Sequence, residues 1–394
     1  MLIFEDFLRR FGVPDESAAT GYSIPATRSS ILVSLMSIGS LLGALSGAYT
    51  SDWWGRRKSL TFGVLLFIVG NVIQITAMQS WIHMMMGRFV AGIGVGNLSV
   101  GELEDPHSQH FRIAEAFLLT SFSLGVPMFQ SECCPREIRG AVVASYQLMI
   151  TIGILVSNLI NYGVREIEDT DASWRIVIGL GIAFSLPLGI GVLFSPESPR
   201  WLASKDRWEE ARMSMARFRG LKDDLNNKMI EDDFGEMYDS IQEQKSAGVG
   251  SWWECFTGSG GKPRVVYRTF LGLGIQFLQQ WTGVNYFFYY GATIFQSAGI
   301  NDELLIQLIL GAVNVATTFP GLYLIERLGR RIPLIYGALW QSAWLLIFAS
   351  VAIARPPTEY ESSGIVMIVA ACMLIASFAM TWGPFAWVVI GESL

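Results

Sequence analysis

The chain has little charge for its length. Asp, Glu, Lys and Arg make up 16% of its 394 residues, while 51% are hydrophobic. Soluble domains carry about 25% charged residues. A soluble protein with this composition would not stay dispersed in water, so the composition favours a membrane protein.

Histidine and cysteine are also scarce, with three and four residues respectively. We find no nucleophile–base set and no metal-ligand cluster, so we expect no enzyme, no cofactor and no metal. We expect no nucleic-acid partner either. The cysteines lie in segments that the topology below places in the cytoplasm or within a span, so we expect no disulfide framework. They are Cys133, Cys134, Cys255 and Cys372. No cleavable signal peptide is evident, because residues 1–11 are charged and lack an apolar core.

Long apolar blocks are abundant. Seven blocks run for about 20 residues with few or no charges, enough to cross the hydrocarbon core of a bilayer. They are Ile31–Thr50, Ser59–Met78, Gly140–Leu159, Ile176–Phe194, Leu305–Leu324, Ile332–Ala352 and Gly364–Ile390. Met84–Val100 is shorter and carries Arg88, and Thr269–Phe295 is long and contains several amides. The blocks are continuously apolar rather than alternating, which excludes membrane strands. The sequence predicts an all-α polytopic membrane helical bundle of nine spans, with the lipid bilayer as its partner.

Positive charge alternates between the loops. Arg56, Arg57 and Lys58 follow the first block, whereas the loops at 79–83 and 356–363 contain no Lys or Arg. Because cytoplasmic loops carry the excess of Lys and Arg, the first of these groups is predicted to face the cytoplasm. The same rule places the N-terminus outside.

The chain is predicted to have four parts. These are an extracellular segment (1–28), an N-terminal helical bundle (29–204), a cytoplasmic helical linker (205–264) and a C-terminal helical bundle (265–394). Asp52–Arg57 and Glu326–Arg331 both have the form acid-x-x-Gly-Arg-Arg directly after an apolar block. Such repeated halves are typical of secondary transporters, whose substrate sites lie between the repeats near the bilayer midplane.

Seven motifs occur in the order found in the sugar porter family of the major facilitator superfamily, and the chain resembles its fungal-type hexose transporters. The motifs are Asp52–Arg57, Gly87-Arg88, Glu132-x-x-Pro135-x-x-x-Arg139-Gly140, Pro196–Arg200, Gln279-Gln280-x-x-Gly283-x-Asn285, Glu326–Arg331 and Gly383-Pro384-x-x-Trp387. The resemblance implies two pseudo-repeated halves and twelve spans. The nine expected here would correspond to the second through tenth, so we expect a chain truncated at both ends.

Residues 101–124 interrupt the resemblance. Removing them joins Asn97–Val100 to Gly125–Met128 in the family pattern. We interpret this segment as an atypical insert within the N-terminal bundle, either a translated, unspliced intron or a genuine insertion. The transcript sequence distinguishes the two.

Uncharged amides within the spans are the candidate substrate-binding residues. Polar side chains are costly in a membrane and therefore point to function. Amides both donate and accept hydrogen bonds, which suits sugar hydroxyls. We expect Gln279, Gln280 and Asn285 to lie on one helix and roughly on one side of it. The resemblance assigns the sugar site to Gln147, Gln279, Gln280, Asn285, Asn314 and Trp387. The alternative is that these amides only hold helices together.

The resemblance also implies a gate and a charge lock. Tyr289 and Tyr290 would close the outer gate, although an interfacial aromatic belt is the alternative. Ion pairs that change between two states would hold the outward-facing state, although these charges also serve topology. The lock residues are Asp52, Arg56, Arg57, Glu132, Arg139, Glu197, Arg200, Glu326, Arg330 and Glu392. Arg88 is the candidate for proton coupling, with snorkelling to the interface as its alternative. The Asp that pairs with this Arg in proton-coupled members would lie on the missing first span.

The predicted function is transmembrane transport of a hexose-like monosaccharide by alternating access, at the plasma membrane. Both facilitated diffusion and proton symport remain open, with the proton as a second small partner. One alternative is a sugar sensor on the same fold. The other is a truncated fragment, and we expect the chain as written not to transport.

Overall fold

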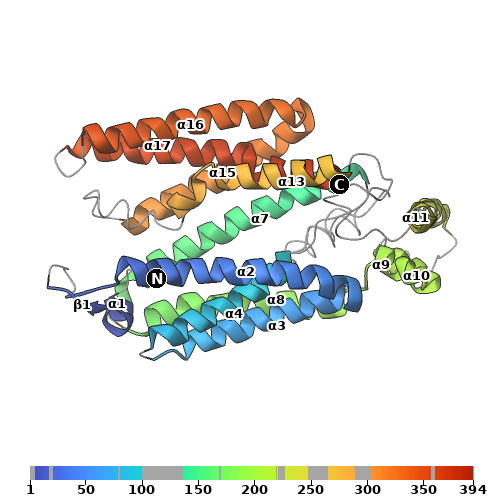
Figure 1. Cartoon of the computed structure of the whole chain (residues 1–394), viewed down its shortest axis with the longest axis horizontal. Coiled ribbons are helices and arrows are strands. Elements are labelled where there is room, and N and C mark those ends of the chain that lie inside the picture. The colour runs from blue at the N-terminus through green and yellow to red at the C-terminus, as the bar shows by residue number, and fades with distance from the viewer. Residues whose placement is uncertain are drawn as a thin grey trace. The chain divides into compact units, whose positions relative to one another are not determined.

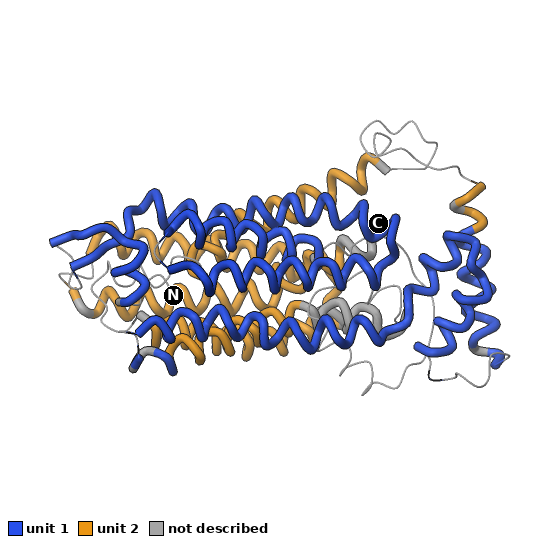
Figure 2. The backbone as a smooth tube through the Cα atoms, turned by 90° about the horizontal axis from the view of Figure 1, so that it is seen from below, with its two compact units in different colours: residues 1–102, 106–137, 163–241 blue, residues 103–105, 138–162, 242–394 orange. Residues whose placement is uncertain are grey.

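The structure is a computed structural model. It describes residues 5–16, 21–78, 80–99, 136–167, 170–218, 220, 227–246, 265–288, 303–355 and 360–393. The predicted insert at 101–124 lies outside these ranges. Packing divides the chain into two compact units (Figure 2). Unit 1 comprises residues 1–102, 106–137 and 163–241, and unit 2 comprises residues 103–105, 138–162 and 242–394.

The described part of unit 1 is built on four long helices (Figure 1). These are α2 (Ala26–Trp54), α3 (Arg56–Ile75), α4 (Trp81–Ser99) and α8 (Ala172–Phe194). Helix α4 packs against both α2 and α3, and α3 packs against α8. The α3–α8 contact is apolar, with Leu60 and Val64 meeting Leu188 and Val192.

Glycines allow α4 to approach both neighbours closely. A methyl group added at Gly92 or Gly96 would overlap the backbone of α2, and one added at Gly94 would overlap the backbone of α3. Helix α2 presents Gly39 and Gly43 to the same contact. Small residues at this spacing are the usual means of close helix packing in membranes.

A short helix and a pair of two-residue strands precede α2. Helix α1 (Glu5–Phe11) is followed by β1 (Val13–Pro14), which pairs antiparallel with β2 (Tyr22–Ser23). Phe7 and Phe11 are buried against the ring of Trp174 at the start of α8. The indole Nε1 of Trp174 donates a hydrogen bond of 3.0 Å to Asp6 Oδ2. Aromatic packing therefore holds this segment onto α8.

Three helices, of which the last two belong to the predicted linker, share a small apolar core. They are α9 (Pro199–Ser204), α10 (Trp208–Phe218) and α11 (Lys228–Ser246). Leu202, Ala211 and Ile241 are buried together. Met215, Ala216 and Ile230 form a second buried cluster within the linker, because apolar residues at helical spacing give α10 and α11 one apolar face each.

Unit 2 contains the other long helices. They are α7 (Arg136–Gly163), α13 (Val265–Gln280), α15 (Glu303–Leu328), α16 (Arg331–Ala354), α17 (Glu361–Met380) and α18 (Trp382–Ser393). A 3-10 turn, η1 (Val164–Ile167), follows α7. Helices α15 and α16 both pack against α17. A large apolar cluster of unit 2 includes Phe287, Leu310, Phe348, Leu374 and Ile375.

The chain breaks between α17 and α18. Thr381 has φ −130° and ψ −86°, outside the helical region. Pro384 has no N–H, so the carbonyl of Met380 loses its intrahelical donor. The loss of this bond accounts for the local break at Trp382-Gly383-Pro384.

Six described segments are long and apolar enough to cross a membrane. They are Ala26–Trp54, Arg56–Ile75, Ala172–Phe194, Leu304–Leu324, Arg331–Ala354 and Ser362–Val389. The three remaining predicted blocks overlap α4, α7 and α13. The division into 29–204 and 265–394 stays a prediction. The compact units differ from this division at residues 138–162, which pack with the C-terminal helices instead of with the rest of the predicted N-terminal bundle.

Candidate functional site

Two buried amides of unit 2 meet the break between α17 and α18. Gln279, at the end of α13, is 6% exposed, and its Nε2 donates a 2.8 Å hydrogen bond to the carbonyl oxygen of Trp382. Gln147, on α7, is 7% exposed. A Cβ added at Gly383 would lie 3.2 Å from Gln147 Nε2. The absence of a side chain at Gly383 therefore makes room for the Gln147 amide.

Gln280 and Asn285 form a second pair, across a turn. Helix α13 ends at Gln280, and helical structure resumes only at Val284, after Gly283 with φ +79°. The Asn285 amide donates a 2.6 Å hydrogen bond to Gln280 Oε1, and Gln280 is exposed. The prediction that Gln279, Gln280 and Asn285 share one helix is wrong. The left-handed glycine ends the helix before Asn285.

Asn314 is the third buried amide. It lies on α15, is 2% exposed, and its Oδ1 has no hydrogen-bond partner among the described residues. An unpaired buried acceptor costs free energy, so its retention points to a ligand or a water. Its helix is joined to α7 by a 2.8 Å hydrogen bond from Asn158 Nδ2 to the carbonyl oxygen of Gln307.

Trp387 is partly buried on α18. It packs against the cluster of Phe385 and Val388, together with Leu322 and Leu334. Tyr289 and Tyr290 lie outside the described residues, so the gate stays a prediction.

The sequence interpretation missed several amides inside apolar blocks, among them Gln276 and Gln341 of unit 2. Gln276 precedes Gln279 by one turn of α13, and Gln341 is buried on α16. Gln276 Nε2 and both polar side-chain atoms of Gln341 have no partner within the described part of the chain. The signal that could have found them is the one already applied to Asn314, an uncharged amide inside an apolar block.

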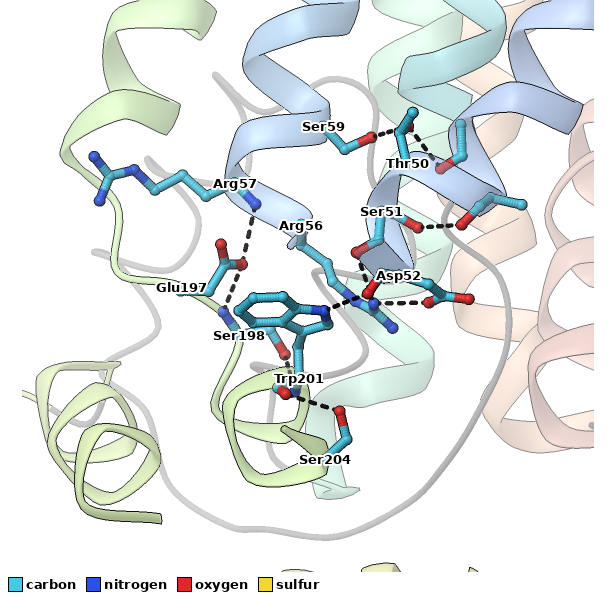
Figure 3. A network of polar contacts seen from close by, with 12 residues as sticks. Thr50, Ser51, Asp52, Arg56, Arg57, Ser59, Glu197, Ser198, Trp201 and Ser204 are labelled. Carbon is cyan, nitrogen blue, oxygen red and sulfur yellow. Dashed lines mark hydrogen bonds and ion pairs between the residues drawn. The ribbon is translucent and has the colours of Figure 1, made fainter. Parts of the chain in front are cut away.

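The corner between α2 and α3 holds the first group of lock residues (Figure 3). Arg56 Nη1 lies 2.9 Å from Asp52 Oδ1 and donates to the carbonyl oxygen of Ser51 at 3.1 Å. The Arg56 side chain is 10% exposed and that of Asp52 is 73% exposed. Gly55, between the helices, has φ +96°, which a residue with a side chain rarely adopts.

Glu197 caps the start of α3 rather than pairing with an arginine side chain in the described structure. Its Oε1 accepts hydrogen bonds from the backbone N–H groups of Arg57 (3.0 Å) and Ser198 (3.1 Å). Figure 3 shows the Arg57 guanidinium directed away from Glu197. Trp201 Nε1 donates to the carbonyl oxygen of Asp52 at 3.0 Å, which ties α9 to the same corner. A carboxylate at a helix N-terminus is favoured by both the free N–H groups and the helix dipole.

The other lock residues are described less completely. Arg200 Nη2 donates to Ser240 Oγ at 3.0 Å, between α9 and α11. Arg330 precedes α16. Glu132 and the side chains of Arg139, Glu326 and Glu392 lie outside the described residues, so the lock stays a prediction. Arg88, on α4, donates from Nη1 to the carbonyl oxygen of Leu32 on α2 at 3.1 Å.

Arg207, just before α10, forms an ion pair with Glu210 in the first turn of α10. Arg207 Nε donates to Glu210 Oε1 at 2.8 Å, and the guanidinium makes a second contact to the same carboxylate. Hydrogen bonding to Arg207 lowers the pKa of the Glu210 carboxyl, and the same bond raises the pKa of Arg207. Both side chains are exposed.

Comparison with known proteins identifies the family. The model of the family "Sugar (and other) transporter" matches residues 1–101 and 110–394. The match leaves out residues 102–109, which lie within the predicted insert. A low-affinity glucose transporter of Kluyveromyces lactis is 37% identical over 98% of this chain and 64% of its own length. The high-affinity fructose transporter ght6 of Schizosaccharomyces pombe is 37% identical over 98% of this chain and 68% of its own length. The chain thus spans about two thirds of the length of these relatives, and both are transporters rather than enzymes.

Solved structures show the same fold. The proton:xylose symporter XylE bound to 6-bromo-6-deoxy-D-glucose has a TM-score of 0.75 at 23% identity, covering 99% of this chain and 76% of that one. A partially occluded, inward-open XylE from E. coli has a TM-score of 0.68 at 23% identity, covering 99% and 81%. This chain is therefore an all-α, multi-pass membrane protein of the major facilitator fold, and it belongs to the sugar transporter family.

Proposed function

We propose that this chain serves the transport of a monosaccharide across a membrane by alternating access. The observation that carries the proposal is the convergence of Gln147 and Gln279 on the helix break at Trp382–Gly383. Buried amides are costly in a membrane, and a helix break in the same place supplies a point of movement.

The chemistry of these side chains fits a sugar. Each amide donates and accepts hydrogen bonds without carrying charge, so a hydroxyl-rich ligand can be bound and released reversibly. The unpartnered Oδ1 of Asn314 and Nε2 of Gln276 offer one acceptor and one donor. Trp387 supplies an apolar ring face. The proposed binding residues are Gln147, Gln276, Gln279, Gln280, Asn285, Asn314 and Trp387.

The hydrogen bond from Gln279 to Trp382 suggests how binding is coupled to movement. Gln279 Nε2 has two N–H groups, and one of them donates to the Trp382 carbonyl oxygen. The bound sugar in this proposal turns the amide toward its own hydroxyls, which breaks the bond to Trp382 and weakens the link between α13 and α18. Alternating access needs two states of similar free energy, and one exchanged hydrogen bond changes their balance by about 1 kcal/mol. Tyr289 and Tyr290 as an outer gate, and the charged span ends as a lock, complete the proposal.

Substrate class and coupling follow from the same proposal. The relatives named above are glucose and fructose transporters, so hexoses are the first substrates to test. Both facilitated diffusion and proton symport are open. Arg88, inside unit 1, is the residue to examine for coupling, by comparing uptake with and without a pH gradient. We place the protein in the plasma membrane.

The test is uptake of radiolabelled glucose, fructose and xylose in a yeast without its own hexose carriers, together with equilibrium binding to the purified protein. We expect Gln279→Ala to weaken binding about 3- to 10-fold, the worth of one hydrogen bond. Gln242→Ala, an exposed amide on α11, is the matched control. Equal binding by both variants overturns the assignment of the site. Binding without any uptake favours a sensor.

A further inference from the structure

A cavity of about 650 Å³ lies within unit 1, at the end where α3 begins and α8 ends. That volume lies in the range of small-molecule sites. Its wall combines cations with apolar side chains. The cations are Arg57, Lys58, Arg207 and Arg217, and the carboxylates are Glu197 and Glu210. This cavity is separate from the amide cluster of unit 2.

Both carboxylates of the cavity are already engaged. Glu197 caps the backbone of α3, and Glu210 pairs with Arg207. Within the described residues, the side chains of Arg57, Lys58 and Arg217 enter no ion pair. The cavity therefore carries an excess of positive charge that an anion would balance.

An exposed apolar stripe runs along α3 away from these cations. Phe62, Leu65, Val69 and Val72 are 38%, 55%, 49% and 46% exposed. Starting from Lys58, the successive intervals to these four residues are four, three, four and three residues. This spacing places all of them on one side of the helix. Phe62 and Leu65 also line the cavity.

Helix α8 adds a parallel apolar stripe. Leu186, Ile190 and Leu193 are exposed at four- and three-residue spacing, and Leu193 lines the cavity. Since α3 and α8 pack together through Val64 and Leu188, the two stripes flank one seam. An elongated apolar chain lying along this seam would end at the cations.

We propose that this cavity binds the headgroup of an anionic phospholipid, whose acyl chains lie along the exposed stripes of α3 and α8. The charge of the cavity matches a phosphodiester. The positive-inside topology places this end in the cytoplasmic leaflet, where anionic lipids are enriched. The proposal rests on that topology and not on which sugar is transported.

The experiment is native mass spectrometry of the purified chain taken from nanodiscs of phosphatidylcholine and phosphatidylserine. The test variant is Lys58→Gln/Arg217→Gln. Each cation near an anionic surface contributes a factor of about 5 in affinity, so phosphatidylserine retention should weaken roughly 25-fold. The control is Lys228→Gln/Arg268→Gln, which removes two exposed cations outside the cavity and should retain the lipid. Lys58→Arg/Arg217→Lys should also retain it. Equal retention by the test variant and this control overturns the proposal.

A second variant tests the acyl chain independently of charge. Phe62→Ser/Leu65→Ser should weaken phosphatidylserine retention, whereas Ile332→Ser/Ile335→Ser, an exposed apolar pair of the same spacing on α16, should not. Glycerophosphoserine, the headgroup without its chains, should compete poorly. Competition by this soluble headgroup, or by an acidic peptide, as strongly as by the lipid would overturn the assignment to a lipid. Thermal unfolding of each variant shows that it is folded.

Discussion

The most exacting prediction concerns Glu197 and the start of α3. Replacing Glu197 by Ala removes the acceptor of two backbone hydrogen bonds, from Arg57 N and Ser198 N, at 3.0 and 3.1 Å. It also removes a negative charge from the positive end of α3. A hydrogen bond to a charged group contributes about 1.5–3 kcal/mol and the helix-dipole interaction about 0.3–1 kcal/mol. Water replaces part of the loss because Glu197 is only half-buried, so we expect about 2 kcal/mol.

The assay is the unfolding midpoint (Tm) of the purified protein in detergent. For a domain of 150–250 residues, 1 kcal/mol corresponds to about 2–4 °C in Tm. Glu197→Ala should therefore lower Tm by roughly 4–8 °C, and Glu197→Gln by less, because the amide oxygen still accepts a hydrogen bond. Glu243→Ala, an exposed acid on α11, should change Tm little.

Arg57 makes the test specific. Its backbone N–H donates to Glu197, while its guanidinium points away (Figure 3). Arg57→Ala keeps the backbone donor and should leave Tm nearly unchanged. If Arg57→Ala and Glu197→Ala lowered Tm equally, Glu197 would be acting through a side-chain ion pair and the capping argument would be refuted.

Three further predictions follow from the same structure. Gly43→Val should prevent folding, measured as loss of the monodisperse elution peak, because even a Cβ at Gly43 would overlap the Ile93 backbone; normal elution would contradict this. Asn314→Leu should raise Tm by removing a buried acceptor that has no partner among the described residues, while weakening sugar binding about 3- to 10-fold; unchanged binding would remove Asn314 from the site. Glu210→Gln should lower Tm slightly at pH 7 and low salt. Because Arg207 lowers the pKa of Glu210, this contribution is present above the ordinary Glu pKa of about 4.3 and is lost as pH falls through the lowered value. The difference between wild type and variant should therefore vanish at low pH and in 1 M salt; a difference that grew on acidification would reverse the assigned sign.

The spans were predictable from the sequence because the signal that marks them is local. Twenty consecutive apolar residues must cross a bilayer as a helix, whatever their neighbours are. The break at Trp382-Gly383-Pro384 was predictable for the same reason, since proline removes a donor wherever it stands. The end of α13 was misjudged because the apolar block Thr269–Phe295 was interpreted as one continuous span. Gly283, a poor helix former within that block, adopts a positive φ where the helix is interrupted.

The partners of the site residues could not be predicted. Nothing in the sequence joins Gln279 to Trp382, which lies 103 residues away, or Glu197 to the backbone of Arg57, 140 residues away. An apolar block reveals which of its polar side chains are costly to bury. The hydrogen-bond partner that offsets this cost comes from another helix, which the block itself does not identify. Gln341 was missed although its signal was the same as that of Asn314.

The two acid-x-x-Gly-Arg-Arg corners show which features depend on the local sequence and which depend on distant residues. Gly55 and Gly329 both adopt positive φ, +96° and +69°, between consecutive long helices. The turn recurs because it depends on the local sequence. The group that caps the following helix is not part of the repeat. At the first corner this group is Glu197, which lies 140 residues beyond Arg57 in the sequence. An internal repeat therefore predicts backbone geometry at both corners, but which charged group stabilises each corner depends on the rest of its own unit.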